Sequence, residues 1–278
     1  MRGECKVQSG ECRVQSEAWR VVAASVRGTS HIKSDLPCQD ALRWQTARGG
    51  WLLAALADGA GSASLAEVGA GIAADRGIEA LKAQVECKSQ AAADEEWRVG
   101  LVAALASARA AVLDAARERK VEARELASTL TLLAVAPGIA VAAQIGDGAA
   151  LASAPPEALA CLTRPMVAEY LNETTFLISE SALESAQTVV RRAAWRHASL
   201  LCDGLQLLAL RLPEGTPHAR FFEPLFGFVD RAANPTAASR ELSAFLQSQR
   251  ITERTDDDLS LLLAAYGNWP GSGSARSE

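Results

Sequence analysis

The chain has 278 residues, of which 49% are hydrophobic, so it is long enough to bury the core of one large domain. Its formal net charge of -5 argues against the positive face that a nucleic-acid-binding protein presents. No apolar run reaches the roughly 20 residues that cross a bilayer, and the N-terminus lacks the apolar stretch of a signal peptide. The six cysteines are too few for a disulfide scaffold. We therefore expect a soluble, cytoplasmic protein with reduced thiols and no membrane or nucleic-acid partner.

The two ends of the chain differ in composition from the middle. The sequence "GECKVQS" at 3–9 is followed by "GECRVQS" at 10–16, and the last residues, "GNWPGSGSARSE", have the composition of a linker. We expect a disordered extension over 1–18, one domain over 19–267 and a flexible tail over 268–278. A metal-binding or disulfide role for the repeated Cys5 and Cys12 is the alternative.

Apolar patterning between these ends predicts strands alternating with long helices. Runs typical of strands lie at 19–26, 41–46, 51–57, 128–135, 139–145, 197–202 and 259–266. Apolar positions at three- and four-residue spacing predict helices at 65–85, 95–120 and 238–249. Hairpins next to long helices favour antiparallel sheets covered by helices, which is an α+β layered domain.

Aspartates occur at the ends of several predicted strands. The turn "ARGG" at 47–50 joins two strands in a register that places Asp40 opposite Ala57 and Asp58. Asp203 also ends a strand, whereas Asp257 and Asp258 begin one, and we expect at most two acids of the run 256–258 to matter. If the last strand runs antiparallel to the other two, Asp58, Asp203 and Asp257 meet at one edge.

The strand at 139–145 runs into Asp147 in the same way, although "GDG" is also an ordinary hairpin turn. Several carboxylates within a few ångströms repel one another unless some are protonated or a cation neutralises them. Oxygen ligands suit Mg or Mn, and the chain has only three histidines, none in a zinc motif. Two such ions sharing a water lower the pKa of that water and direct it at phosphorus, which is the chemistry of phosphate ester hydrolysis.

Five motifs occur in order along the chain: "CQDA" (38–41), "LADGAGSA" (56–63), "IGDGA" (145–149), "LLCDGL" (200–205) and "DDLSLLLA" (257–264). In their order and character they resemble the motifs of the metal-dependent PP2C-type protein serine/threonine phosphatases, in a bacterial branch. The lead-in "SVRGTSHIKSDLPCQDA" and the central "EYLNETTFL" (169–177) support the bacterial branch. The resemblance covers roughly residues 19–266.

The resemblance implies a four-layer αββα sandwich with a binuclear Mn or Mg site. By this resemblance Asp58 bridges two ions, the Gly59 carbonyl binds one of them, and Asp203 and Asp257 bind the other. Asp147 matches the ligand of a third, weaker metal together with Asp203. Asp40 corresponds to the acid that hydrogen-bonds a metal-bound water.

Two positions depart from the family pattern. Gln39 stands where relatives often have a Glu ligand, so we expect weaker metal affinity at that site. The Arg that often grips the substrate phosphate is replaced by Asp35 at the nearest spacing, which leaves Arg27, His31 or Lys33 to supply the positive charge. His31 is also a candidate acid for the leaving serine or threonine oxygen.

These observations predict a Mn- or Mg-dependent protein serine/threonine phosphatase in which water attacks phosphorus directly. Its expected substrates are phosphorylated signalling proteins, and pairing with a Ser/Thr kinase is an expectation at the level of the family. The competing hypothesis is a weak or inactive module that binds phosphoproteins, with Gln39 and the missing Arg as signs of lost catalysis. A phosphatase fold used as a scaffold is a third class, which metal affinity would distinguish.

Overall fold

The computed structural model describes residues 17–154, 159–165, 175–212 and 214–268. The Cys5/Cys12 repeat, residues 1–16 of the predicted extension and residues 269–278 of the predicted tail lie outside the described residues. The first described element is a strand that begins at Glu17.

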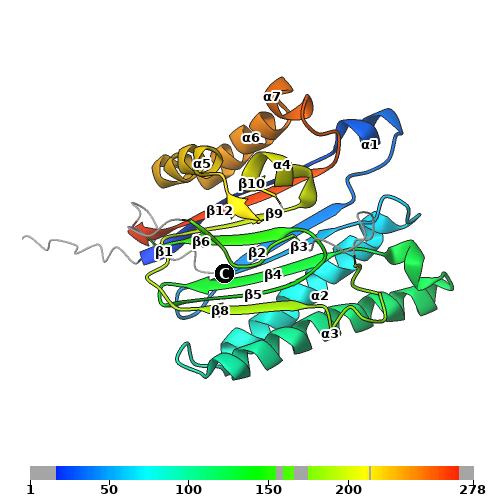
Figure 1. The fold of residues 1–278 in the computed structure, drawn as a ribbon, viewed down its shortest axis with the longest axis horizontal. Coiled ribbons are helices and arrows are strands. Elements are labelled where there is room, and N and C mark those ends of the chain that lie inside the picture. The colour runs from blue at the N-terminus through cyan, green and yellow to red at the C-terminus, as the bar shows by residue number, and fades with distance from the viewer. Residues whose placement is uncertain (1–16, 155–158, 166–174, 213, 269–278) are drawn as a thin grey trace, which may run out of the picture.

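Two antiparallel sheets stack face to face (Figure 1). The first has the strand order β1-β12-β9-β6-β7, with bounds Glu17–Val26, Leu259–Asn268, His197–Leu201, Ala149–Ser153 and Ala160–Cys161. The second has the order β2-β3-β4-β5-β8, with bounds Asp40–Ala47, Trp51–Asp58, Leu130–Ala136, Ile139–Ile145 and Gln187–Arg191.

A pair of longer helices covers the outer face of each sheet (Figure 1). Helices α2 (Ala66–Cys87) and α3 (Asp94–Arg119) pack on the second sheet, and α5 (Ala219–Arg231) and α6 (Pro235–Leu246) pack on the first. The predicted α+β class and its four layers are confirmed. The short elements are α1 (Thr29–Lys33), η1 (Ala123–Leu126), η2 (Asp203–Leu205), α4 (Gln206–Ala209), β10 (Leu210–Arg211), β11 (Thr216–Pro217) and α7 (Gln249–Thr252).

Three apolar cores separate the layers. The central core lies between the sheets and includes Leu56, Leu133, Leu200 and Leu262, each at most 2% exposed. The strands β3, β4 and β5 of the second sheet are buried on both faces, so their sequences are almost entirely apolar rather than alternating. This rigid double sheet fixes the positions of the loops at its ends.

Helix α3 is the one helix of the described chain that is long and apolar enough to cross a membrane by length and composition. Its apolar side chains, Trp97, Leu101, Leu105 and Val112 among them, are buried in the core beneath α2 and α3. Such burial is typical of a core helix in a layered domain.

Most predicted elements are found within a few residues of their expected bounds. Helix α6 begins at Pro235 rather than at 238, because the Asn234 side chain caps it by accepting hydrogen bonds from the Thr236 and Ala237 amides. The strands β6 and β8 and the helix α5, which has Pro224 inside it, were not predicted from the pattern.

Candidate active site

The hairpin of β2 and β3 has the predicted register, with Asp40 directly opposite Asp58. Strand β12 runs antiparallel to β9, as expected, but these two strands belong to the first sheet and β3 belongs to the second. The prediction that Asp58, Asp203 and Asp257 share the edge of one sheet is therefore wrong in this detail. The acids come from two facing sheets and meet at the same end of the sandwich.

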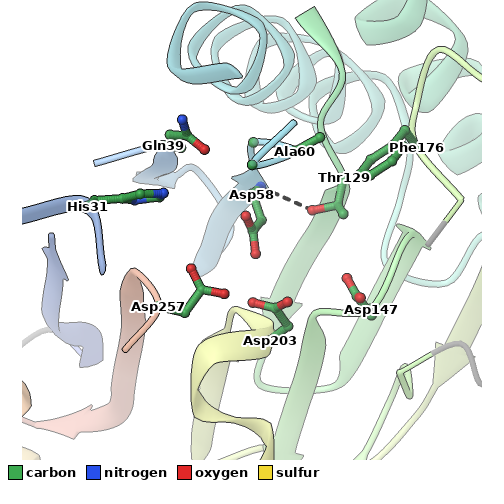
Figure 2. Close-up of a pocket in the computed structure, with 11 residues that line it drawn as sticks. His31, Gln39, Asp58, Ala60, Thr129, Asp147, Phe176, Asp203 and Asp257 are labelled. Carbon is green, nitrogen blue, oxygen red and sulfur yellow. Dashed lines mark hydrogen bonds between the residues drawn. The ribbon is translucent and has the colours of Figure 1, made fainter. Parts of the chain in front are cut away.

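An open cleft of about 200 Å³ lies at this end. Figure 2 shows the carboxylates of Asp58, Asp147, Asp203 and Asp257 directed into one space. His31 and Gln39 line one side of the cleft, and Thr129 and Phe176 line the other. No Lys or Arg of the described chain lines it.

Asp58 is fixed by the neighbouring strand of its own sheet. Its amide donates to Thr129 Oγ1 at 3.0 Å, and its carbonyl accepts from the Thr129 amide at 2.8 Å. The next residue, Gly59, donates its amide to the Gln39 carbonyl at 3.1 Å. These backbone contacts on both sides direct the Asp58 side chain out of the sheet and into the cleft.

Asp203 and Asp257 are brought together by close backbone packing. A Cβ on Gly204 would lie 2.3 Å from the Asp258 carbonyl oxygen, and one on Gly28 would lie 2.3 Å from the Asp257 carbonyl carbon. No side chain fits at either position, so glycine is required for the three segments to pack. Asp257 is thereby held between the end of β1 and the start of η2.

Asp147 lies in the link between β5 and β6. These strands belong to different sheets, so the "GDG" stretch carries the chain across the sandwich and is not the turn of a hairpin. The Asp147 carbonyl accepts a hydrogen bond from Gln206 Nε2 at 2.6 Å, and the Gly146 carbonyl accepts one from Gln144 Nε2 at 3.0 Å. The turn is therefore held from both sides with its acid in the cleft.

Asp258 is the support that the sequence analysis missed. Its buried carboxylate accepts the amides of Gly28 and Gln39, both at 2.6 Å, and lies 3.0 Å from His31 Nδ1. One side chain thus joins the start of β12, the helix α1 that carries His31, and the start of β2. The run of three aspartates gave a partial signal, because at most two of them were expected to matter. Of the three, only Asp258 is buried, and Asp256 does not line the cleft.

Burial and mutual repulsion raise the pKa values of the clustered acids. Burial raises the pKa of Asp40 to about 7, the charges of Asp258 and Asp203 add to the rise, and Ser260 and Cys202 partly offset it. Burial raises the pKa of Asp203 to about 6, with Asp147 and Asp257 contributing. The pKa of Asp58 lies well above its ordinary value, first through burial and then through the charges of Asp40 and Asp203. Burial also raises the pKa of Asp257.

The donor set fits a hard divalent cation. Both carboxylate oxygens of Asp40, Asp203 Oδ1 and Gln39 Oε1 are buried without a hydrogen-bond partner in the described chain. Oxygen atoms left in this state are costly, and a cation relieves both the missing partners and the repulsion. No group of three acidic, His or Cys side chains in the described residues is arranged to hold an ion as it stands, so binding requires the carboxylates to draw closer.

The cationic residues that were predicted to contact the phosphate lie in different places. His31 lines the cleft, whereas the exposed Arg27 donates to the Leu36 carbonyl at 3.0 Å and does not line it. Asp40 pairs with Asp58 across the hairpin and is not among the residues that line the cleft. Lys33 and Asp35 are exposed. Thr129 was also missed, because a threonine near the start of a strand carries no distinguishing signal.

Comparison with known proteins decides the family. The sequence model described as protein phosphatase 2C matches residues 27–247. The chain belongs to the protein phosphatase 2C family. It is 32% identical over 258 residues to serine/threonine-protein phosphatase 3 of Escherichia coli strain K12, a match that covers 90% of this chain and 99% of that relative. The chain is thus a protein serine/threonine phosphatase of the PP2C type, as the motifs predicted.

Solved structures agree on the PP2C fold. The serine/threonine phosphatase Stp1 from Staphylococcus aureus matches with a TM-score of 0.60 at 15% identity, over 92% of this chain and 98% of the other. The catalytic domain of the serine/threonine phosphatase PstP, in complex with two manganese ions, matches with a TM-score of 0.56 at 18% identity, over 90% and 99%. At this identity the likeness concerns the fold, and the roles of single residues stay predictions.

Proposed function

We propose that this phosphatase hydrolyses phosphoserine and phosphothreonine in proteins at a site that holds two Mn or Mg ions. One observation carries the proposal. The cleft is lined by four carboxylates and by no Lys or Arg of the described chain, so without a cation it repels a phosphate dianion. The manganese in the PstP structure and the donor set of this cleft support a divalent ion.

Asp58 and the Gly59 carbonyl would hold one ion, and Asp58, Asp203 and Asp257 the other. Asp147 and Asp203 would hold a third, weaker one. Bound there, the ions supply positive charge to the phosphate oxygens and acidify water.

The side chains of the chain orient the reactants and move protons. Asp40 lies opposite Asp58 with both carboxylate oxygens buried, and it would accept a hydrogen bond from the attacking water. His31 Nδ1 faces Asp258, which leaves Nε2 to donate a proton to the leaving serine or threonine oxygen. The water attacks phosphorus directly, and no side chain becomes phosphorylated. Signalling in the cytoplasm, opposite a Ser/Thr kinase, is the biological setting that we propose.

The test is hydrolysis of para-nitrophenyl phosphate and of a phosphothreonine peptide, with Mn, with EDTA and with Asp58→Asn. We expect turnover that requires Mn and is lost in the variant. Absence of turnover by folded protein at every Mn and Mg concentration would favour a module that only binds phosphoproteins.

A further inference from the structure

A second cavity, of about 320 Å³, lies apart from the catalytic cleft. It is bounded by β7, by the residues that follow β8 and by β11, and no acidic side chain of the described chain lines it. The lining side chains that matter here are Arg164, Arg191, Arg192 and Trp195. We call this cavity the arginine groove.

Two of the three arginines are available to a ligand. Arg192 is engaged, because it pairs with Asp94 at 3.0 Å and donates to the carbonyls of Gln90 and Ala92, each at 2.7 Å. Arg164 and Arg191 are exposed and have no ion-pair partner in the described part of the chain. Because the chain as a whole is acidic, two unpaired guanidinium groups in one cavity form a local site of positive charge.

The groove is built from fixed parts of the fold. Trp195 is buried and donates Nε1 to the Arg191 carbonyl at 3.4 Å, which holds the bend after β8. Gly215 has a φ of 64°, and a Cβ there would lie 3.1 Å from Arg164 Cγ. The glycine therefore lets the aliphatic part of Arg164 lie against the backbone of the loop before β11.

A short chain of contacts connects the groove to the catalytic cleft. Gln144 Nε2 donates to the Arg164 carbonyl at 2.9 Å and to the carbonyl of Gly146, the neighbour of Asp147, at 3.0 Å. Gln144 also pairs with Gln187 across the sheet, and Arg191 lies at the far end of the same strand. At about 3.3 Å per residue, Arg191 lies roughly 13 Å beyond Gln187. Arg164 therefore lies near the Asp147 side of the cleft, and Arg191 lies farther from it.

We propose that the arginine groove binds acidic residues, or a second phosphate, of the phosphoprotein substrate a few residues away from the phosphoserine or phosphothreonine in the cleft. Guanidinium groups bind carboxylates and phosphates through paired hydrogen bonds. Gln144 bridges the carbonyls of Arg164 and Gly146, so a few residues of extended peptide reach Arg164 from the cleft. About seven residues reach Arg191, which pairs with Ala140. The inference rests on the proposed function and adds a preference among its substrates.

The experiment compares two phosphothreonine peptides that differ only in flanking Glu residues and their Gln counterparts. Wild-type protein is measured beside Arg164→Gln, Arg191→Gln, the double variant and a control, Arg240→Gln, which changes an exposed arginine on α6. We expect the wild type to prefer the acidic peptide by about tenfold in kcat/KM, mainly through KM, and the preference to weaken with salt. The double variant should lose the preference, and the control should keep it.

Para-nitrophenyl phosphate separates this inference from the proposed function. It is too small to reach the groove, so we expect all the variants to hydrolyse it at the wild-type rate. Equal kcat/KM for the two peptides, with normal turnover of para-nitrophenyl phosphate, would overturn the proposed role of the groove and leave the proposed phosphatase function standing. If the wild type turns over neither substrate, the fluorescence anisotropy of labelled peptides in EDTA tests the groove by binding alone. Stronger binding of the acidic peptide that requires Arg164 and Arg191 supports the proposed groove. Equal binding of the two peptides overturns it.

Discussion

Two pairs of acids at the candidate site are positioned in different ways. Asp40 and Asp58 face each other across a hairpin of neighbouring strands, so local register places them. Asp203 and Asp257 come from distant parts of the chain, and the pairing of β9 with β12 together with the contacts of Gly28, Gly204 and Asp258 places them. The first pair therefore depends on one turn, and the second pair depends on long-range packing.

The largest expected effect is on catalysis and is common to both pairs. Asp203→Asn should lower kcat by about a thousandfold, as should Asp58→Asn, because each removes a negative charge that the bound ions need. Steady-state kinetics with para-nitrophenyl phosphate measure this, and circular dichroism confirms folding. Asp256→Asn, an exposed neighbour, is the matched control. A fully active Asp203→Asn protein would mean that the second pair is not part of the site.

A smaller effect, on the free energy of unfolding, tests Asp258 as the residue that holds the second pair in place. Asp258→Ala should lower the free energy of unfolding by about 3 kcal/mol, because it leaves the Gly28 and Gln39 amides without their buried acceptor. Asp256→Ala should change it by less than about 0.5 kcal/mol. Urea unfolding measures both values. Equal stability of the two variants would show that Asp258 does not hold the second pair in place.

The stability of the metal-free protein should fall as pH rises, which is opposite to the pH dependence that most acidic clusters produce. In the folded chain without metal the pKa is about 7 for Asp40 and about 6 for Asp203, against an ordinary value of 3.8. Between these values the folded state binds more protons than the unfolded state, so the free energy of unfolding falls as pH rises from about 4 to about 7.

Melting temperatures measured in EDTA at about pH 5 and about pH 8 test this, and the lower value is expected at the higher pH. Mn should restore stability at the higher pH, since it binds the ionised acids of the folded state. Asp40→Asn should flatten the dependence. A melting temperature in EDTA that rises with pH would contradict the burial of these carboxyls.

The smallest effect concerns Gln39, which lines the cleft beside the first pair and has a buried Oε1 without a partner in the described chain. Gln39→Glu should tighten Mn binding by about tenfold, because it adds a negative charge beside the ion that the Gly59 carbonyl is proposed to hold. Calorimetric titration of the variant and of a Gln45→Glu control measures this. Unchanged affinity in Gln39→Glu would place this side chain outside the metal site.

The contrast between the pairs also explains what the sequence could predict. Apolar runs and the "ARGG" turn were enough to place Asp40 opposite Asp58, because a hairpin register depends only on nearby residues. The division of the acids between two sheets was not predictable in this way, because strand partners far apart in sequence leave no periodic signal. The short strand β8 and the proline-containing helix α5 were missed for similar reasons, since tertiary packing stabilises them.

The site residues also differ in how well the sequence predicted their roles. Acids at the ends of strands were identified by position and by family resemblance, and the structure brings four of them to one cleft. Arg27 was a candidate because of its charge, and its guanidinium instead contacts the Leu36 carbonyl. Asp258 was hidden among three consecutive acids, since burial separates it from Asp256 and burial depends on the fold.

The central claim is that acids from both sheets hold divalent ions together, and calorimetric titration of the metal-free protein with Mn tests it most directly. The account predicts that about two Mn ions bind per chain, and that Asp58→Asn and Asp203→Asn each lose binding while keeping the fold. Unchanged stoichiometry and affinity in both variants would contradict it, because the ions would then be held elsewhere.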